Sequence, residues 1–525
     1  MDPDNLSAPE RALWRAFPRG EVVDLTRARG VRARTIRAEV IAALLLGAVP
    51  PEPGRTAAIR LDGAKVTGQL NLSYASVRGP VLLRHCEFDA AIDLTGAKVR
   101  DVDLEGSRLV GLLAALAEID GNLSVVECES AGMIVLTGAH VTGGLRMRDS
   151  RLANPGDTAL LGNRLVIDDD LLAQRAAVTG ELRLGAARVG GLILLDGAIL
   201  RNPGETALGG RNLSVGSAVR ARGCDATGAI DLRNADIGRD LDLRDATLSN
   251  PGGNALVAYG VRTGSSLSFQ GGTADGLIWI SGAQVGAEIF FDKARVVNPA
   301  DCAIRCRSAQ VRVLVLGPDF RAEGTVDFRD SRFTTVRDDQ NSWPERMRLS
   351  GTSYDVLDPP LRAAQRVHWL RRDVDGYTPQ NYETLAAAYR ARGDDASARA
   401  VLLAKERQRR DNLPWYGRLW SWTQEITVGF GYQPLRAGIW LVGFLGLGTL
   451  VFGLHHPPPL PGTAHPAFNP LIYTVDLLVP LVDLGLRNSY DPQGPQRWLA
   501  YFLIAVGWIF VTTIAAAIVR VLQRQ

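Results

Sequence analysis

The sequence predicts a mainly β protein. Its centre is a right-handed parallel β-helix solenoid, with a helical cap before it, an αα-hairpin after it and a two-span transmembrane hairpin at the C-terminus. The main observation is a 48-residue repeat marked by an Asn-Pro-Gly turn. A second is a step of 10 or 11 residues between short apolar runs, and a third is a pair of long uncharged stretches near the end. The turns are Asn154-Pro155-Gly156, Asn202-Pro203-Gly204, Asn250-Pro251-Gly252 and Asn298-Pro299.

The two periods together select the kind of solenoid. Self-similarity at a fixed period is the signature of solenoids, propellers and repeat arrays. Runs such as Ile92-Asp93-Leu94 alternate apolar and polar residues, as very short strands do. Helical repeats need roughly 30 to 45 residues per unit and propeller blades need four longer strands, so neither fits the short step. A parallel β-helix over 56–340 fits, with about a dozen coils between Ile59 and Phe333.

The 48-residue register predicts which side chains face the interior. We interpret each unit as two coils plus one turn insert. Ile193, Leu241 and Ile289 occupy the same position in successive units. Because inward aliphatic side chains stack coil on coil in a β-helix, we expect these three to be buried.

Leu-centred runs and Gly-Ala corners at 94–99 and 136–141 resemble those of the pentapeptide-repeat proteins. This resemblance covers roughly half of the chain and implies the same stacking of short coils. The strict five-residue register is loose here, and the Asn-Pro-Gly insert is foreign to that family.

Residues 1–55 are predicted to form a helical cap, because an open β-helix end would invite strand pairing. Helical spacing is expected over 8–47, with apolar stripes that cover the first coil. The stripes are Ala12, Leu13 and Phe17, and then Ile36, Val40, Ile41, Leu44 and Leu45.

A connector is predicted over 341–425. Thr378-Pro379 provides an N-cap followed by proline at the first helical position, and Gly393 ends the helix before a second one opens at Asp394-Asp395. The pair resembles a single tetratricopeptide-like αα-hairpin, and an interfacial helix is expected after it. A basic cluster ends the second helix and is predicted to face the inner leaflet. The cluster is Lys405, Arg407, Arg409 and Arg410.

The last domain, 426–525, is predicted to enter a membrane. Its spans are expected at about 437–454 and 498–519, which are uncharged and long enough to cross a bilayer. Aromatic residues flank both stretches, as they do at membrane interfaces. Basic flanks before the first span and after the second place both termini and the solenoid in the cytoplasm, at the plasma membrane. The first thirty residues hold charges and no apolar run, so no signal peptide is expected.

The segment between the spans, 469–486, is too apolar for an exposed loop and too short for a third span. An interfacial or re-entrant helix is expected here, which Pro470 can start and Pro480 must bend or end. Asp476 and Asp483 are seven residues apart, so an unbroken helix would carry both on one face. One interpretation is an amphipathic helix on the headgroups with both carboxylates in water. The other is an oligomer that gathers them into a ring along a cation path.

Charge and motifs bear on function. The formal net charge is +3, so nucleic acid is not a favoured partner. Residues 57–340 hold 31 basic and 35 acidic side chains, so the solenoid is too nearly neutral to favour imitation of DNA by an acidic surface. The motif search gives no Walker loop, nucleophile elbow or metal-ligand spacing. We therefore predict no catalytic residue, no metal ligand and no cofactor.

The helix pair, the cap and the two spans together resemble a family of actinobacterial membrane-anchored repeat proteins. Some members of that family carry the label "membrane-associated oxidoreductase". The favoured function is a membrane-tethered cytoplasmic scaffold that binds the lipid bilayer and an unidentified protein partner. The alternatives are an oligomeric two-span pore with a solenoid sensor and, from the family label alone, an oxidoreductase.

Overall fold

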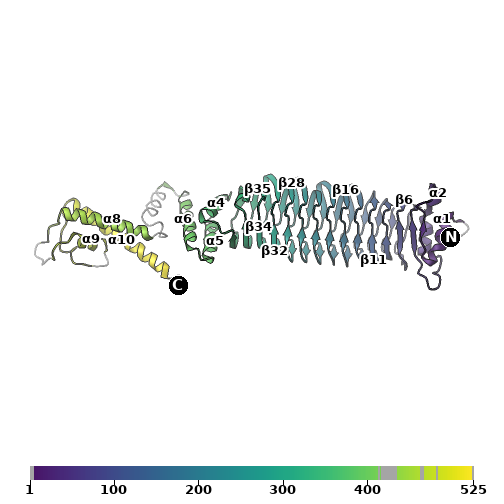
Figure 1. Ribbon diagram of the computed structural model, residues 1–525, viewed down its shortest axis with the longest axis horizontal. Helices are drawn as coiled ribbons and strands as arrows, with labels where there is room; N and C mark the ends of the chain where they lie inside the picture. Colours follow the sequence, from purple (N-terminus) through teal and green to yellow (C-terminus); the bar gives the residue numbers. More distant parts are fainter. Residues whose placement is uncertain (1–4, 412–413, 416–433, 461–465, 480–482, 523–525) are drawn as a thin grey trace. The chain divides into compact units, whose positions relative to one another are not determined.

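The chain forms two compact units, Met1–Ala391 and Arg392–Gln525. The first is a parallel β-solenoid whose strands stack between α1 (Ala8–Ala16) and α4 (Ala363–Leu370), which confirms the predicted mainly β fold (Figure 1). The computed structural model describes residues 5–411, 414–415, 434–460, 466–479 and 483–522.

Two sheets wind around the solenoid, and every pairing within them is parallel. In the described residues, sheet A has 21 strands and sheet B has 17. Sheet A comprises β1 (Val23–Asp24), β3 (Ile59–Asp62), β5 (Val81–Arg84), β8 (Lys98–Asp103), β11 (Glu118–Ser124), β14 (His140–Val141), β15 (Leu145–Arg146), β17 (Val166–Ile167), β18 (Leu171–Leu172), β20 (Arg188–Val189), β21 (Ile193–Leu194), β23 (Ser214–Val215), β24 (Val219–Arg220), β26 (Asp236–Ile237), β27 (Leu241–Asp242), β29 (Arg262–Thr263), β30 (Leu267–Ser268), β32 (Gln284–Phe290), β34 (Gln310–Leu316), β36 (Arg332–Asp338) and β38 (Ser353–Asp358). Sheet B comprises β2 (Thr35–Arg37), β4 (Lys65–Thr67), β6 (Glu87–Phe88), β7 (Ile92–Asp93), β9 (Arg108–Leu109), β10 (Leu112–Leu113), β12 (Glu129–Ser130), β13 (Ile134–Val135), β16 (Arg151–Leu161), β19 (Ala177–Arg183), β22 (Ile199–Gly209), β25 (Asp225–Asp231), β28 (Thr247–Val257), β31 (Thr273–Trp279), β33 (Arg295–Arg305), β35 (Arg321–Asp327) and β37 (Arg346–Arg348).

Each coil has four sides. The coil that begins at β17 passes through β18 and the two halves of β19 before β20 starts the next coil. The two halves of β19 are separated by a register shift between Thr179 and Leu182. Successive sides begin five or six residues apart, so the 10- or 11-residue step seen in the sequence spans two sides.

The 48-residue unit consists of two coils of unequal length, as predicted. Leu145 pairs with Leu171, 26 residues on, and Leu171 pairs with Ile193, 22 residues on. The longer coil contains the insert within β16, where the ladder shifts register between Ala153 and Thr158. In each insert an asparagine Nδ2 donates to a backbone carbonyl four residues on, at 2.7 to 2.9 Å. These asparagines are Asn154, Asn202, Asn250 and Asn298.

The interior is a stack of aliphatic side chains. Ile193, Leu241 and Ile289 are all buried, at most 1% exposed, which confirms the inward register. Leu241 pairs with Val219 on one side and Leu267 on the other. Burial of one such side chain stabilises the fold by about 1.5–3 kcal/mol.

The N-terminal cap combines helices with strands, where helix alone was expected. α1 and α3 (Ala38–Leu45) flank the short helices η2 (Phe17–Arg19) and α2 (Val31–Arg34), and β1 and β2 pair with β3 and β4 of the first full coil. Thr35 and Ile36 are β-branched and fit a strand better than a helix. Because these strands cover the first coil's edges, the cap completes the sheets as well as burying its apolar stripe.

A buried carboxylate joins the two parts of the cap. Glu10 in α1 is 2% exposed, and its Oε1 accepts from the Nε and the backbone N–H of Arg37, at 2.9 and 3.0 Å. Its Oε2 accepts from the backbone N–H of Ser7 at 2.8 Å. Burial alone would raise the pKa of Glu10, but these hydrogen bonds outweigh it and lower the pKa to about 2.

The cap is therefore expected to be sensitive to acid. Because the pKa of Glu10 is lower in the folded than in the unfolded chain, its ionised carboxylate stabilises the fold. This stabilisation is complete above about pH 4.5 and is lost as the pH falls towards 2. We expect Glu10→Gln to lower the free energy of unfolding by about 2–3 kcal/mol at pH 6 and by much less at pH 2.5, allowing for screening at Arg37. Thermal melts of both proteins across this pH range measure the difference. A difference that did not shrink on acidification would contradict the assignment.

The solenoid continues beyond the expected boundary at residue 340. After η3 (Gln340–Ser342), β37 and β38 pair with β35 and β36. The last coil is then covered by α4 and by α5 (Pro379–Ala391), whose Tyr389 hydroxyl donates to the carbonyl of Leu361 at 2.6 Å. The end of the solenoid is thus closed by helices, as a free sheet edge requires.

The second unit is helical, with α6 (Asp395–Asp411), α8 (Pro434–Leu454), α9 (Pro470–Leu478) and α10 (Pro495–Leu522). Both helices of the predicted αα-hairpin are present, α5 in the first unit and α6 in the second. A small core joins α8, α9 and α10, with Phe452, Tyr473 and Leu503 at its centre. The interfacial helix expected before residue 425 falls on 416–433, outside the described residues.

Within the described residues, no helix combines the length and the apolarity that a membrane crossing needs. The structure therefore gives no support to the predicted spans at about 437–454 and 498–519.

Candidate interaction surfaces

A polar groove of about 480 Å³ lies on sheet B, between the first two inserts. Its charged groups are largely paired with one another. Arg183 pairs with Glu181, and the Arg211 Nε donates to Asp231 at 2.7 Å. The lining holds four carboxylates, those of Asp157, Glu181, Glu205 and Asp231, against two arginines, so the groove is acidic overall.

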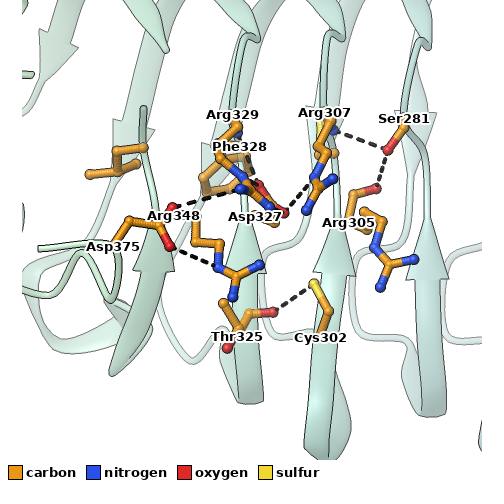
Figure 2. A network of polar contacts seen from close by, with 12 residues as sticks. Ser281, Cys302, Arg305, Arg307, Thr325, Asp327, Phe328, Arg329, Arg348 and Asp375 are labelled. Atoms are coloured by element: carbon orange, nitrogen blue, oxygen red, sulfur yellow. Dashed lines mark hydrogen bonds and ion pairs between the residues drawn. The ribbon is translucent and has the colours of Figure 1, made fainter. Parts of the chain in front are cut away.

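A repeated Asp–Arg cluster ties neighbouring coils together, twice on sheet B and once on sheet A. Figure 2 shows one copy, in which the buried Asp327 lies between Arg307 of the preceding coil and Arg329 of its own. The Nε of Arg307 donates to Oδ2 at 2.6 Å, and Nη2 of Arg329 donates to the same oxygen at 2.8 Å. Arg348, also in Figure 2, pairs instead with Asp375 at 3.3 Å.

The same cluster occurs at two further places. Asp231 accepts from Arg211 and Arg233, and Asp242 accepts from the corresponding pair Arg222 and Arg244. Burial raises the pKa of both carboxyl groups, but the guanidinium hydrogen bonds outweigh it and leave each pKa below its usual value. In the third copy burial outweighs the hydrogen bonds and raises the pKa of Asp327. All three carboxylates are engaged in contacts between coils.

A furrow follows the first side of the coils along sheet A. Its N-terminal section has a volume of about 450 Å³, and its C-terminal section about 690 Å³. The same ladder passes through both, from Lys98 and Glu118 to Arg262, Gln284 and Arg332. The two sections therefore lie on the same side of the solenoid.

The two sections differ in charge. In the N-terminal section, Lys98 pairs with Glu118 at 2.8 Å and Arg100 pairs with Asp120 at 3.2 Å. The C-terminal section carries three exposed arginines that have no ion pair within the described part of the chain, and one carboxylate, that of Asp236. These arginines are Arg262, Arg312 and Arg332.

The floor of the furrow is a ladder of glycines. A Cβ at Gly238, Gly264 or Gly286 would lie only 2.1 to 2.3 Å from the carbonyl oxygen of the glycine one coil before it. Side chains are excluded there by the close approach of successive coils. Along this line the floor of the furrow therefore consists of backbone atoms only.

The C-terminal unit places the two predicted carboxylates in different environments. Asp476 is 2% exposed, and its carboxylate accepts backbone N–H groups of Leu484, Leu486 and Arg487 at 2.9, 3.0 and 2.7 Å. Asp483 is exposed and accepts from the Gly485 N–H at 2.9 Å.

The helix starts at Pro470 and ends before Pro480, as predicted, so the unbroken helix that would carry both carboxylates on one face does not form. α9 ends at Leu478, two residues before Pro480, because a residue before proline is disfavoured in the α-region. Asp476 accepts hydrogen bonds from the chain that follows the helix and does not face water.

The predicted basic cluster lies in the last turns of α6. Arg407 and Arg409 are exposed, and Arg409 pairs with Glu406 of the same helix at 3.6 Å. Lys405 and Arg410 are half-buried. The cluster is thus present as an exposed basic helix end.

The described parts of α8 and α10 carry a large exposed apolar surface. Several side chains in these helices are more than half exposed, although a compact core is available beside them. The exposed apolar residues are Ile439, Trp440, Val442, Leu447, Leu450 and Leu454 on α8, and Trp498, Tyr501, Phe502, Trp508 and Ile509 on α10.

Among the described residues, the five cysteines and the metal-ligating side chains form no recognisable centre. All five cysteines are buried and free, and burial raises the pKa of Cys302 to about 11 and those of the other four to about 12. In the part of the chain that the structure describes, no group of three or more His, Cys, Asp or Glu is placed to hold a metal ion.

Sequence reasoning missed the furrow arginines and the Asp–Arg clusters. A signal for the clusters was available, since each Asp is followed two residues later by one Arg and preceded by another twenty residues earlier, as in Arg211, Asp231 and Arg233. Comparison with protein-family models, with curated proteins and with solved structures gives no match.

Proposed function

We propose that this chain is a membrane-tethered scaffold. The solenoid presents a long lateral surface to a protein partner, and the C-terminal helical unit holds it at the cytoplasmic face of the plasma membrane. The observation that carries the proposal is the exposed apolar surface of α8 and α10, which includes Ile439, Val442 and Ile509. Exposed apolar patches of this kind mark contacts with membranes or with other proteins.

Aromatic composition favours lipid as the contact of this surface. Trp498, Tyr501 and Trp508 are exposed together on α10, and Trp440 is exposed on α8. Tryptophan and tyrosine are enriched where a protein meets the headgroup region of a bilayer. The tether therefore rests on the exposed apolar and aromatic side chains, and we place the predicted two-helix insertion within α8 and α10.

The basic end of α6 supports the cytoplasmic orientation. Lysine and arginine close to the start of a membrane segment favour the cytoplasmic side, and each contributes about 1 kcal/mol of attraction to anionic lipid. Arg407 and Arg409 are exposed for this role.

The solenoid itself fits a binding surface better than a catalytic one. Repeat solenoids offer extended lateral faces to their partners. The buried aspartates of sheet B are held by arginines of adjacent coils, and the C-terminal section of the furrow on sheet A leaves arginines exposed.

Vesicle flotation tests the tether. Full-length protein is expected to float with vesicles of phosphatidylcholine and phosphatidylglycerol and to stay bound after alkaline carbonate washing. The variant Ile439→Asp/Val442→Asp/Ile509→Asp should lose this binding, because each carboxylate would enter hydrocarbon. The solenoid variant Arg239→Asp is the matched control and should float normally. Wild-type protein that remained unbound would overturn the proposal.

Cysteine labelling tests the orientation in cells. Because the five native thiols are buried, Arg409→Cys introduces a reactive exposed thiol on α6. A membrane-impermeant maleimide should label it only after the cells are opened. Labelling of intact cells would place this helix end outside and end the cytoplasmic assignment.

A further inference from the structure

The C-terminal section of the sheet A furrow concentrates positive charge on a body that is acidic overall. The range 57–340 holds 31 basic and 35 acidic side chains, and most arginines of this range are paired with carboxylates, as Arg211, Arg222 and Arg307 are. Arg262, Arg312 and Arg332 are exceptions among the described residues, since no carboxylate lies within ion-pair distance of them. Guanidinium groups left exposed in a groove are ready to bind carboxylate or phosphate.

The spacing of these arginines follows from the coil geometry. Arg262 pairs in register with Gln284, Gln284 with Gln310, and Gln310 with Arg332. Hydrogen-bonded strands lie about 4.8 Å apart, so Arg262 and Arg332 are about 14 Å apart along the furrow. In an extended peptide, residues i and i+4 share one face and lie about 13 Å apart. Arg312 follows Gln310 by two residues, so it lies on the coil next to that of Arg332, two coils from Arg262.

The rest of the lining suits a polypeptide. The amide side chains of Gln284 and Gln310 stand between the terminal arginines and can both donate to and accept from a peptide backbone. Gly264 and Gly286 line the same section and carry no side chain that would project into it. The described lining of this section contains no aromatic side chain, whereas single-stranded nucleic acid is bound on stacking aromatic platforms.

We propose that the C-terminal section of the furrow binds an extended acidic segment of a partner protein, with carboxylates on alternate residues facing Arg262, Arg312 and Arg332. This inference deepens the scaffold function and rests on it, because it names the chemistry of the scaffold's partner. The N-terminal section of the same furrow is not expected to take part, since its lysine and one of its arginines are already paired with Glu118 and Asp120.

Fluorescence anisotropy on full-length detergent-solubilised protein tests the inference. The probe is a fluorescein-labelled seven-residue peptide of alternating glutamate and threonine. The wild type should bind it, and Arg262→Gln/Arg312→Gln/Arg332→Gln should weaken binding about tenfold or more. The matched control Lys98→Gln/Arg100→Gln alters the paired section and should leave affinity unchanged. Binding should also weaken as salt is raised from 50 to 500 mM, as expected for exposed charges.

Several outcomes would overturn the inference. Equal binding by the triple-arginine variant, or equal binding of the same peptide with lysine in place of glutamate, would show that the furrow arginines do not select the ligand. Tighter binding of polygalacturonate or of a single-stranded oligonucleotide would assign the groove to another polyanion. If the protein floated with vesicles but did not bind the peptide, this inference would be wrong and the proposed tether would stand. If it bound the peptide but did not float, only the proposed tether would be wrong.

Discussion

Leu241→Asp is expected to unfold the coils around it and to lower the free energy of unfolding by more than about 4 kcal/mol. Leu241 is fully buried and stacks between Val219 and Leu267 in the interior ladder. A carboxylate at this position would have no partner and no water, which costs several kcal/mol in addition to the lost aliphatic packing. Ile193→Asp and Ile289→Asp should have the same effect, because both side chains occupy equivalent sites.

The damage should be local, because a solenoid coil contacts mainly its neighbours. Hydrogen exchange with peptide-level readout should show lost protection around residues 215–270 and retained protection near Ile59. The control is Arg239→Asp, which introduces the same carboxylate two residues away on the exposed surface and should change stability by less than about 0.5 kcal/mol. Native protection in the Leu241→Asp protein would show that this position does not hold the interior together.

The buried positions of the interior could be predicted because the same local sequence pattern recurs in every coil. An inward aliphatic position must be filled in every coil, so Ile193, Leu241 and Ile289 recur at one fixed interval. The insert could also be predicted from the sequence, because its asparagine side chain donates a hydrogen bond to a backbone carbonyl of the same turn. Neither feature depends on residues that are distant in sequence.

The surface could not be predicted in the same way. The furrow arginines are brought together by coils of alternating 22 and 26 residues, so Arg262, Arg312 and Arg332 follow no single period. Whether a given arginine is paired depends on a carboxylate one coil away, as with Arg100 and Asp120.

Asp476 illustrates a second limit of the sequence pattern. Its seven-residue spacing from Asp483 suggested a shared helix face, but helix α9 ends at Leu478. The carboxylate then meets backbone N–H groups that lie eight to eleven residues further on. Helical periodicity contains no information about such a fold-back, because it is created by packing within the core of α8, α9 and α10.

A buried ion pair closes the C-terminal end of the solenoid. Arg366 of α4 and Asp338 of β36 are both fully buried at their side chains, with Nη1–Oδ2 and Nη2–Oδ1 distances of 2.6 and 2.8 Å. The Trp343 Nε1–H donates to the same carboxylate at 2.8 Å. The guanidinium carbon of Arg366 also lies 5.6 Å from the Trp343 ring centre and 5.9 Å from that of Trp369.

Arg366→Met is expected to lower the free energy of unfolding by about 3–5 kcal/mol, because it leaves the Asp338 carboxylate buried without its cation. The second variant, Arg366→Met/Asp338→Asn, removes the stranded charge while keeping an acceptor for Trp343, so it should recover much of that loss.

Arg337→Met is the matched control: its partner Asp358 is half exposed, and the change should cost less than about 1 kcal/mol. Urea unfolding measures all three variants, and size-exclusion chromatography reports association through an uncovered last coil. A loss in Arg366→Met no larger than in Arg337→Met would show that helix α4 is held to the solenoid by its apolar contacts, with no net contribution from the ion pair.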